Sequence, residues 1–241
     1  MKRIQEENPI WHAMIWVFMY ILLVNVGDLI SENIGIDNSA TSVLLIVLSV
    51  ALLIYIKKND WFNYYGIRRP DKADFKKSLF YVPLIIMALI QYFKGINSEL
   101  GFQGIGLGIV LMICVGWIEE ILFRGFLYQG ILKKSGLVRA VIISGITFGI
   151  GHIVNLMRGY SMADQAVQIV AAILIGIALA LLIAVTKNIM PGVVFHILFN
   201  ISGTITNNNL SMEIMMVIAI IVICALYSIY LRKSLTSQKT L

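Results

Sequence analysis

Long runs of apolar residues alternate with short polar connections along the whole chain. A helix that crosses a bilayer needs about 20 mostly apolar residues, and eight runs of roughly this length are present. They predict membrane-spanning helices at about residues 10–30, 41–57, 75–94, 104–131, 138–157, 166–186, 189–206 and 212–231. The pattern therefore predicts an all-α fold, a multi-pass membrane helix bundle of about eight transmembrane helices. We expect it to form a single membrane domain over residues 1–241.

The composition excludes two other classes of protein. Hydrophobic residues make up 59% of the 241 residues and charged residues only 13%, with a mean hydropathy of +0.86. Soluble domains carry roughly 25% charged residues, and disordered chains are charge-rich and poor in aliphatic side chains. Cys114 and Cys224 both lie within apolar runs, so they predict neither a disulfide framework nor a paired zinc motif.

The positions of the charges predict how the chain crosses the membrane. If the N-terminus is cytoplasmic, 16 of the 19 Lys and Arg residues fall in cytoplasmic segments, as the positive-inside rule requires. The acidic residues expected outside are Asp28, Glu32, Asp37, Glu99, Asp164 and Glu213. We therefore expect both termini in the cytoplasm. We attribute the formal net charge of +6 to the basic residues of the cytoplasmic segments, which set the membrane topology. No nucleic-acid partner is expected.

Residues 58–74 form the longest polar connection and combine aromatic with basic residues, among them Trp61, Arg68 and Arg69. We interpret this stretch as an interfacial segment whose rings lie at the level of the headgroups and whose cations face anionic lipid.

Ionisable groups inside a membrane span cost about 2.5–3.5 kcal/mol each on insertion scales. Each one is therefore expected to have a structural or functional role. Three predicted spans contain such polar groups, which are Glu119, Glu120 and Arg124; Phe148 and His152; and His196 and Asn200. Glu120 and Arg124 have the favourable i,i+4 spacing, so we expect that pair to be structural and Glu119 to remain unpaired and free for chemistry. The helical rise places the three sets at overlapping depths. Gly145 and Gly149 share a face with His152 and predict a close helix neighbour.

This set of residues is compatible with more than one chemistry. A carboxylate and an imidazole can activate water, while a second imidazole and an amide can bind an oxyanion. Glu119, His152 and His196 could instead bind Zn²⁺ with an open position for water. Buried Glu and His can also form the proton relay of a transporter. The spacing alone does not separate these possibilities.

Three motifs carry a family resemblance: Glu119-Glu120-xxx-Arg124, Phe148-xxx-His152 and His196-xxx-Asn200, in this order on separate predicted spans. Together they resemble the CPBP (CAAX protease and bacteriocin-processing, or ABI) family of intramembrane proteases. The resemblance covers about residues 105–205, which would be the catalytic core.

The resemblance implies a CAAX prenyl protease-like endopeptidase, acting on membrane-associated peptides or on CAAX-type, prenylated or bacteriocin-like substrates. By the family pattern, Glu119 activates water with help from His152, and His196 and Asn200 bind the oxyanion. In the older metalloprotease description of the family, Glu119, His152 and His196 would be candidate ligands of Zn²⁺. Glu120 and Arg124 would hold the helix geometry, and Phe148 would pack at the wall of the site.

Two other functions remain open on the sequence. One is a proton-coupled membrane transporter, and the other is a non-catalytic bacteriocin-immunity or scaffold protein. In each case we expect a multi-pass protein of the cell membrane, in the lipid bilayer of a bacterial plasma membrane.

Overall fold

The computed structural model describes residues 1–69, 78–153 and 162–239. Within these ranges the fold is helical, with one isolated β-bridge between Ile96 and Thr206. The elements are α1(Lys2–Glu7), α2(Pro9–Ile34), α3(Ser39–Lys58), η1(Ser78–Tyr81), α5(Val82–Ile90), η2(Gln91–Lys94), η3(Ser98–Leu100), α6(Gly101–Glu119), η4(Glu120–Leu127), α7(Tyr128–Ser135), α8(Leu137–Gly151), α9(Met162–Thr186), α10(Met190–Ile205) and α11(Leu210–Lys239).

The predicted all-α membrane bundle is confirmed. Five described helices are long and apolar enough to cross a membrane, and three shorter apolar helices span Leu79–Lys94, Leu137–Gly151 and Met190–Ile205. These eight segments match the eight predicted runs, although the number of crossings stays a prediction. The predicted span 138–157 ends as a helix at Gly151, and residues 154–157 lie outside the described residues.

Proline and glycine set several helix boundaries. Pro9 and Pro191 lie in the first turns of α2 and α10, where the missing amide hydrogen and the fixed φ are favourable. Gly35 ends α2 in the left-handed conformation with φ 75°, and Gly136 separates α7 from α8 with φ 80°. These positions turn the chain sharply between neighbouring helices.

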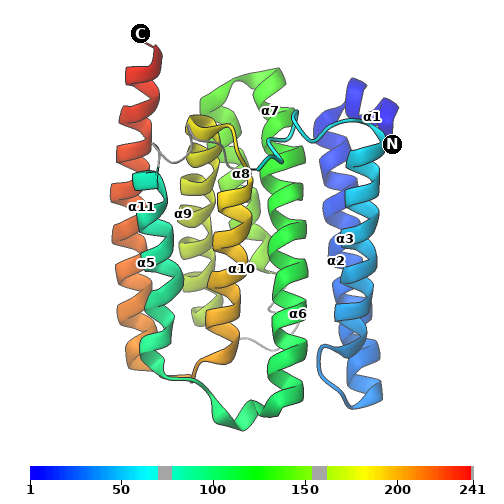
Figure 1. Ribbon diagram of the computed structural model, residues 1–241, viewed down its shortest axis with the longest axis vertical. Helices are drawn as coiled ribbons and strands as arrows, with labels where there is room; N and C mark the ends of the chain where they lie inside the picture. Colours follow the sequence, from blue (N-terminus) through cyan, green and yellow to red (C-terminus); the bar gives the residue numbers. More distant parts are fainter. Residues whose placement is uncertain (70–77, 154–161, 240–241) are drawn as a thin grey trace.

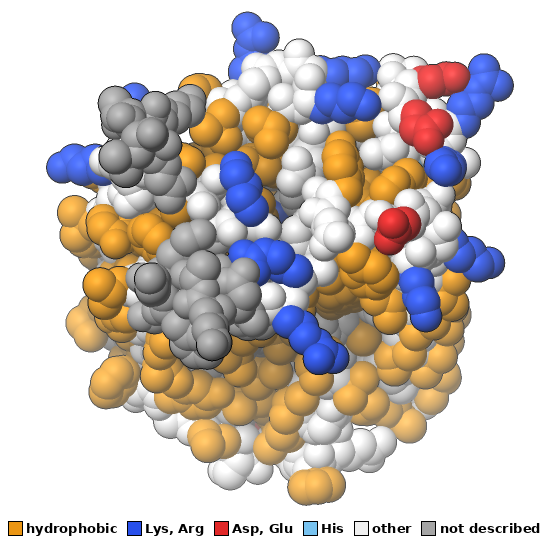
Figure 2. Space-filling view, turned by 45° about the horizontal axis from the view of Figure 1, so that its top comes forward, with side chains coloured by type: hydrophobic (Ala, Val, Ile, Leu, Met, Phe, Trp, Pro, Cys, Tyr) orange, Lys and Arg blue, Asp and Glu red, His pale blue; other side chains and the backbone are white. Residues whose placement is uncertain are grey.

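The helices run side by side along the long axis, and both termini lie at the same end of the bundle (Figure 1). Figure 2 shows Lys and Arg side chains gathered at this end, whereas hydrophobic side chains cover the sides of the bundle below it. Large exposed apolar side chains include Phe18, Val47 and Leu226, as expected for helix faces that meet lipid. The shared end agrees with the predicted placement of the termini on one side, and its cytoplasmic location remains a prediction.

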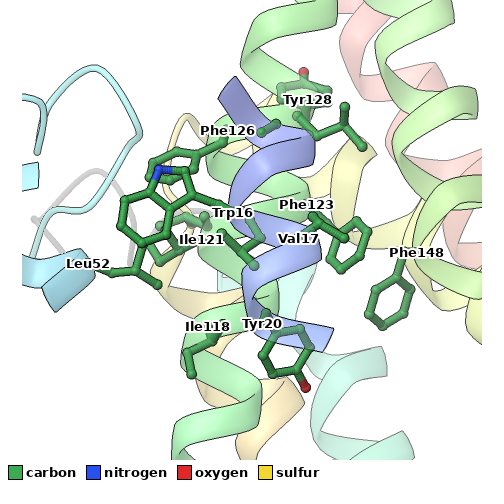
Figure 3. Close-up of a cluster of buried hydrophobic side chains, with 14 of the residues drawn as sticks. Trp16, Val17, Tyr20, Leu52, Ile118, Ile121, Phe123, Phe126, Tyr128 and Phe148 are labelled. Atoms are coloured by element: carbon green, nitrogen blue, oxygen red, sulfur yellow. The ribbon is translucent and has the colours of Figure 1, made fainter. Parts of the chain in front are cut away.

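Two hydrophobic cores hold the bundle together. The first joins α2, α3, α6 and η4, and Figure 3 shows Trp16, Leu52, Ile118, Ile121 and Phe126 within it. The second joins α5, α9, α10 and α11. The elements that carry the predicted motifs, α6, η4, α8 and α10, all contribute side chains to the first core, and α10 also contributes to the second.

Helices α8 and α9 come into close contact along the predicted glycine face. A Cβ atom at Gly145 would lie 2.6 Å from Cγ1 of Ile177, and one at Gly149 would lie 2.3 Å from Cγ1 of Ile173. Small residues allow this approach of two helix backbones, as the sequence predicts.

We expect Gly149→Ala to lower the stability of the bundle by about 1–3 kcal/mol, because the added methyl group overpacks the α8–α9 contact. In thermal unfolding in detergent, each kcal/mol corresponds to a fall of about 2–4 °C in the midpoint. Gly106→Ala is the matched control, because a Cβ there meets nothing within 4 Å. The control is expected to be neutral or stabilising, and equal midpoints for the two variants would contradict the close packing.

Candidate active site

The two adjacent glutamates lie where α6 meets a π-helical segment. Glu119 is the last residue of α6, and Glu120 begins η4, in which every residue is buried. Such wide helical turns are rare and are often found at functional sites. The sequence predicts one regular helix over 104–131, so the change of helix type is a correction. It alters the directions in which neighbouring side chains point.

Glu120 forms the predicted ion pair with Arg124. Oε1 of Glu120 lies 2.8 Å from Nη1 of Arg124, and both side chains are fully buried. The guanidinium does not make an aligned hydrogen bond to any described residue, but its Cζ atom lies over the Phe148 ring, 4.0 Å from the ring centre. A cation over an aromatic face is favourable, and more so without water. Arg124 is thus held by one carboxylate and one ring.

His196 bridges the two glutamates. Its Nδ1 lies 3.0 Å from Oε1 of Glu120, and its Nε2 lies 3.4 Å from Oε2 of Glu119. Glycines bring α10 this close to α6. A Cβ atom at Gly116 would lie 2.7 Å from Ile197, and one at Gly192 would lie 3.2 Å from Oε2 of Glu120.

Glu119 differs from its neighbour in exposure and in partners. Its side chain is 15% exposed, whereas that of Glu120 is fully buried. Oε1 of Glu119 accepts a hydrogen bond of 2.8 Å from the Tyr20 hydroxyl of α2. The expectation that Glu119 is unpaired is therefore wrong. Tyr20 is not among the predicted site residues, because a tyrosine in an apolar span usually packs in the core. Its hydroxyl group is the only feature of the sequence that could have indicated a role in the site.

Phe148 lines the cavity beside both histidines, as expected for a residue of the wall of the site. Its ring packs edge to face against His152 and His196, with centroid distances of 5.2 and 5.5 Å. Phe123 packs against it at 5.3 Å, and Figure 3 shows the two rings next to each other. One ring thus contacts side chains from η4, α8 and α10.

His152 and Asn200 line the same cavity as Glu119 and Tyr20. Nδ1 of His152 lies 3.2 Å from the carbonyl oxygen of Phe148, so an Nδ1–H would donate there and Nε2 would remain for other partners. The backbone carbonyl of Asn200 accepts a hydrogen bond from the Thr204 hydroxyl, and its side-chain amide makes no hydrogen bond to a described residue. The structure brings His196 next to Glu119, whereas it places His152 and Asn200 on the wall of the cavity.

The cavity has a volume of about 1270 Å³, and its lining includes Glu119 but not Glu120. Its lining continues along α2 to Asp28 and Asp37, near the connection between α2 and α3. That connection lies at the end of the bundle opposite the termini (Figure 1). The cavity therefore extends from Glu119 toward the end of the bundle opposite the termini.

The proposed zinc ligands do not fit a three-ligand site. Among the described residues, no three His, Cys, Asp or Glu side chains gather closely enough to bind a metal ion. Both ring nitrogens of His196 face carboxylates, and Nδ1 of His152 faces a carbonyl oxygen. A catalytic zinc ion needs three protein ligands around one point, and Glu119, His152 and His196 do not provide this arrangement.

No curated protein and no solved structure matches the chain significantly. A protein-family model, described as type II CAAX prenyl endopeptidase Rce1-like, matches residues 82–202. The match contains all seven predicted site residues and nearly all of the predicted core 105–205, but it does not reach Tyr20. It confirms the resemblance drawn from the three motifs and supports endopeptidase activity at the level of the family. By its motifs and by this match over half its length, the chain belongs to the Rce1-like family of type II CAAX prenyl endopeptidases.

Proposed function

We propose that this protein is a glutamate-dependent intramembrane endopeptidase in which Glu119 activates the attacking water. One observation carries the proposal. Of two adjacent carboxylates, Glu120 is buried and paired with Arg124, whereas Glu119 lines a cavity large enough for a peptide segment. A carboxylate that reaches such a cavity can accept a proton from water, and a neutralised one cannot do so as readily.

The proposed reaction needs no covalent intermediate. Glu119 takes a proton from a water molecule while the water oxygen attacks the carbonyl carbon of the scissile peptide bond. The carbonyl oxygen becomes an oxyanion, and the side-chain amide of Asn200 donates a hydrogen bond to it, while Nε2 of His152 accepts one from the attacking water. As the tetrahedral intermediate collapses, the C–N bond breaks and the proton passes from Glu119 to the leaving nitrogen.

We assign His196 to orienting Glu119 rather than to the oxyanion. Its two ring nitrogens already face one carboxylate each. With both nitrogens facing carboxylates in this way, the ring holds Glu119 in place relative to Glu120 and has no nitrogen left to donate to an oxyanion.

The proposed substrates are membrane-associated peptides, which include CAAX-type, prenylated or bacteriocin-like ones, in a bacterial plasma membrane. The position of the cavity supports access from the end of the bundle near the α2–α3 connection. Asp28 and Asp37 on its lining give that access route an acidic character.

We expect Glu119→Gln to lower the cleavage rate of a membrane-associated peptide by about 10²–10⁴-fold, because an amide cannot accept the proton from water. Cleavage is measured with purified protein in proteoliposomes. Glu99→Gln, at an exposed position in η3, is the control and should retain full activity. An unchanged rate in Glu119→Gln would contradict the mechanism and would favour a non-catalytic role. Glu119-dependent proton flux without cleavage would favour a transporter.

We expect dialysis against a strong metal chelator to leave the cleavage rate unchanged, because the donor set does not fit a catalytic zinc ion. The rate and the zinc content of the same sample are measured together. Loss of activity on dialysis, with recovery when Zn²⁺ is added, would contradict the metal-free mechanism while leaving the endopeptidase activity in place.

Tyr20→Phe removes the hydrogen bond to Glu119 but keeps the packing of the ring. Hydrogen bonds to charged groups contribute about 1.5–3 kcal/mol, so we expect kcat to fall about 10–100-fold with KM unchanged. Tyr92→Phe, at an exposed position in η2, is the control. A change in KM alone would contradict a role of Tyr20 in positioning Glu119.

A further inference from the structure

A second cavity lies on the other side of α10 and is not part of the active site. It has a volume of about 610 Å³ and is bounded by α5 and α10. The lining from α5 includes Leu84, Ile85 and Ala88, and the lining from α10 includes Val194 and Leu198. All of these side chains are apolar. We call this cavity the α5–α10 groove.

The α5–α10 groove is open toward the surroundings of the bundle. Ile85, Val194 and Leu198 are 56%, 51% and 48% exposed, although each also lines the groove. The stretch of α10 from Met190 to Leu198 rises about 12 Å, close to the thickness of one hydrocarbon leaflet of about 15 Å. A chain from one leaflet would therefore fit along the groove.

Two arginines lie at one end of the groove. Arg68 and Arg69 belong to its lining, and the segment after α3 that carries them lies at the end of the bundle that holds both termini (Figure 1). Arg68 donates hydrogen bonds to the carbonyl oxygen of Thr186 at 3.3 Å and to that of Arg69 at 3.4 Å. The Arg69 side chain is exposed.

The segment that carries the arginines is fixed above α10. The amide of Ile189 donates a 2.9 Å hydrogen bond to the carbonyl oxygen of Gly66. Gly66 has φ 69°, and a Cβ atom there would lie 2.9 Å from the carbonyl oxygen of Lys187. Because the backbone is anchored in this way, the chain at Arg68 and Arg69 is held close to the start of α10.

We propose that the α5–α10 groove binds an anionic phospholipid, with one acyl chain between α5 and α10 and the phosphate at Arg68 and Arg69. An apolar slot of one-leaflet length with cations at its end matches the order of chain and phosphate in such a lipid. Anionic lipids also concentrate at the cytoplasmic leaflet, where the basic end of the bundle is expected. The bound lipid fills the space behind α10, whose other face carries His196 and Asn200.

The test is competitive lipid binding by the full chain in detergent, followed by native mass spectrometry. Phosphatidylglycerol and phosphatidylcholine with identical chains are added in equal amounts. We expect the protein to retain phosphatidylglycerol over phosphatidylcholine with a preference of about tenfold or more. Each basic residue near an anionic headgroup raises the affinity about fivefold. Arg68→Gln/Arg69→Gln should abolish the preference, and Arg69→Gln alone should reduce it if the double variant fails to fold.

The matched control is Lys133→Gln/Lys134→Gln, which removes two charges elsewhere on the basic end and should leave the preference intact. Val194→Trp should reduce retention of both lipids by filling the groove, whereas Val222→Trp on the exposed face of α11 should not. Equal retention of the two lipids by the unmodified protein would overturn the proposal. Loss of the preference in the lysine control would do so too, as would displacement of the lipid by inorganic phosphate. None of these readouts depends on proteolysis.

Discussion

The buried ion pair between Glu120 and Arg124 is the interaction on which the rest of the site depends. Both side chains are fully withdrawn from solvent, and removing one partner of such a pair is far more destabilising than the pair is stabilising. The two charges therefore must stay together. Each also fixes a neighbour, because Glu120 contacts His196 and Arg124 covers Phe148. Through these contacts one ion pair holds α6, η4, α8 and α10 in a single arrangement.

Close backbone contacts make that arrangement possible. Gly116 and Gly192 let α10 approach the glutamates, and Gly149 lets α9 support α8 from behind. In a membrane, helices gain little from hydrophobic attraction, so close packing and polar contacts provide most of the specificity. The glycines and the ion pair act together. Without the glycines, His196 could not reach both carboxylates, and Glu119 would lose one of its two neighbours.

The sequence predicted the class of fold, the helical segments and the Glu120–Arg124 pair, because hydropathy and i,i+4 spacing are local signals. It also placed Glu119, His152, His196 and Asn200 at similar depths. It did not predict η4, since the change to a wider helical turn depends on how eight buried residues pack against other helices. It missed the Tyr20–Glu119 hydrogen bond because the two residues are 99 positions apart and one of them lies outside the motifs.

Adjacent carboxylates in one protein can have different roles only if their surroundings differ. At positions 119 and 120 the difference comes from geometry, because the junction of α6 and η4 points one side chain into the protein and the other into the cavity. The cavity and the α5–α10 groove then flank α10 from two sides. A helix that carries His196 on one face and borders a lipid-facing groove on the other connects the site directly to the bilayer. If the α5–α10 groove binds an anionic lipid, as proposed, the composition of the membrane would act on the active site through α10.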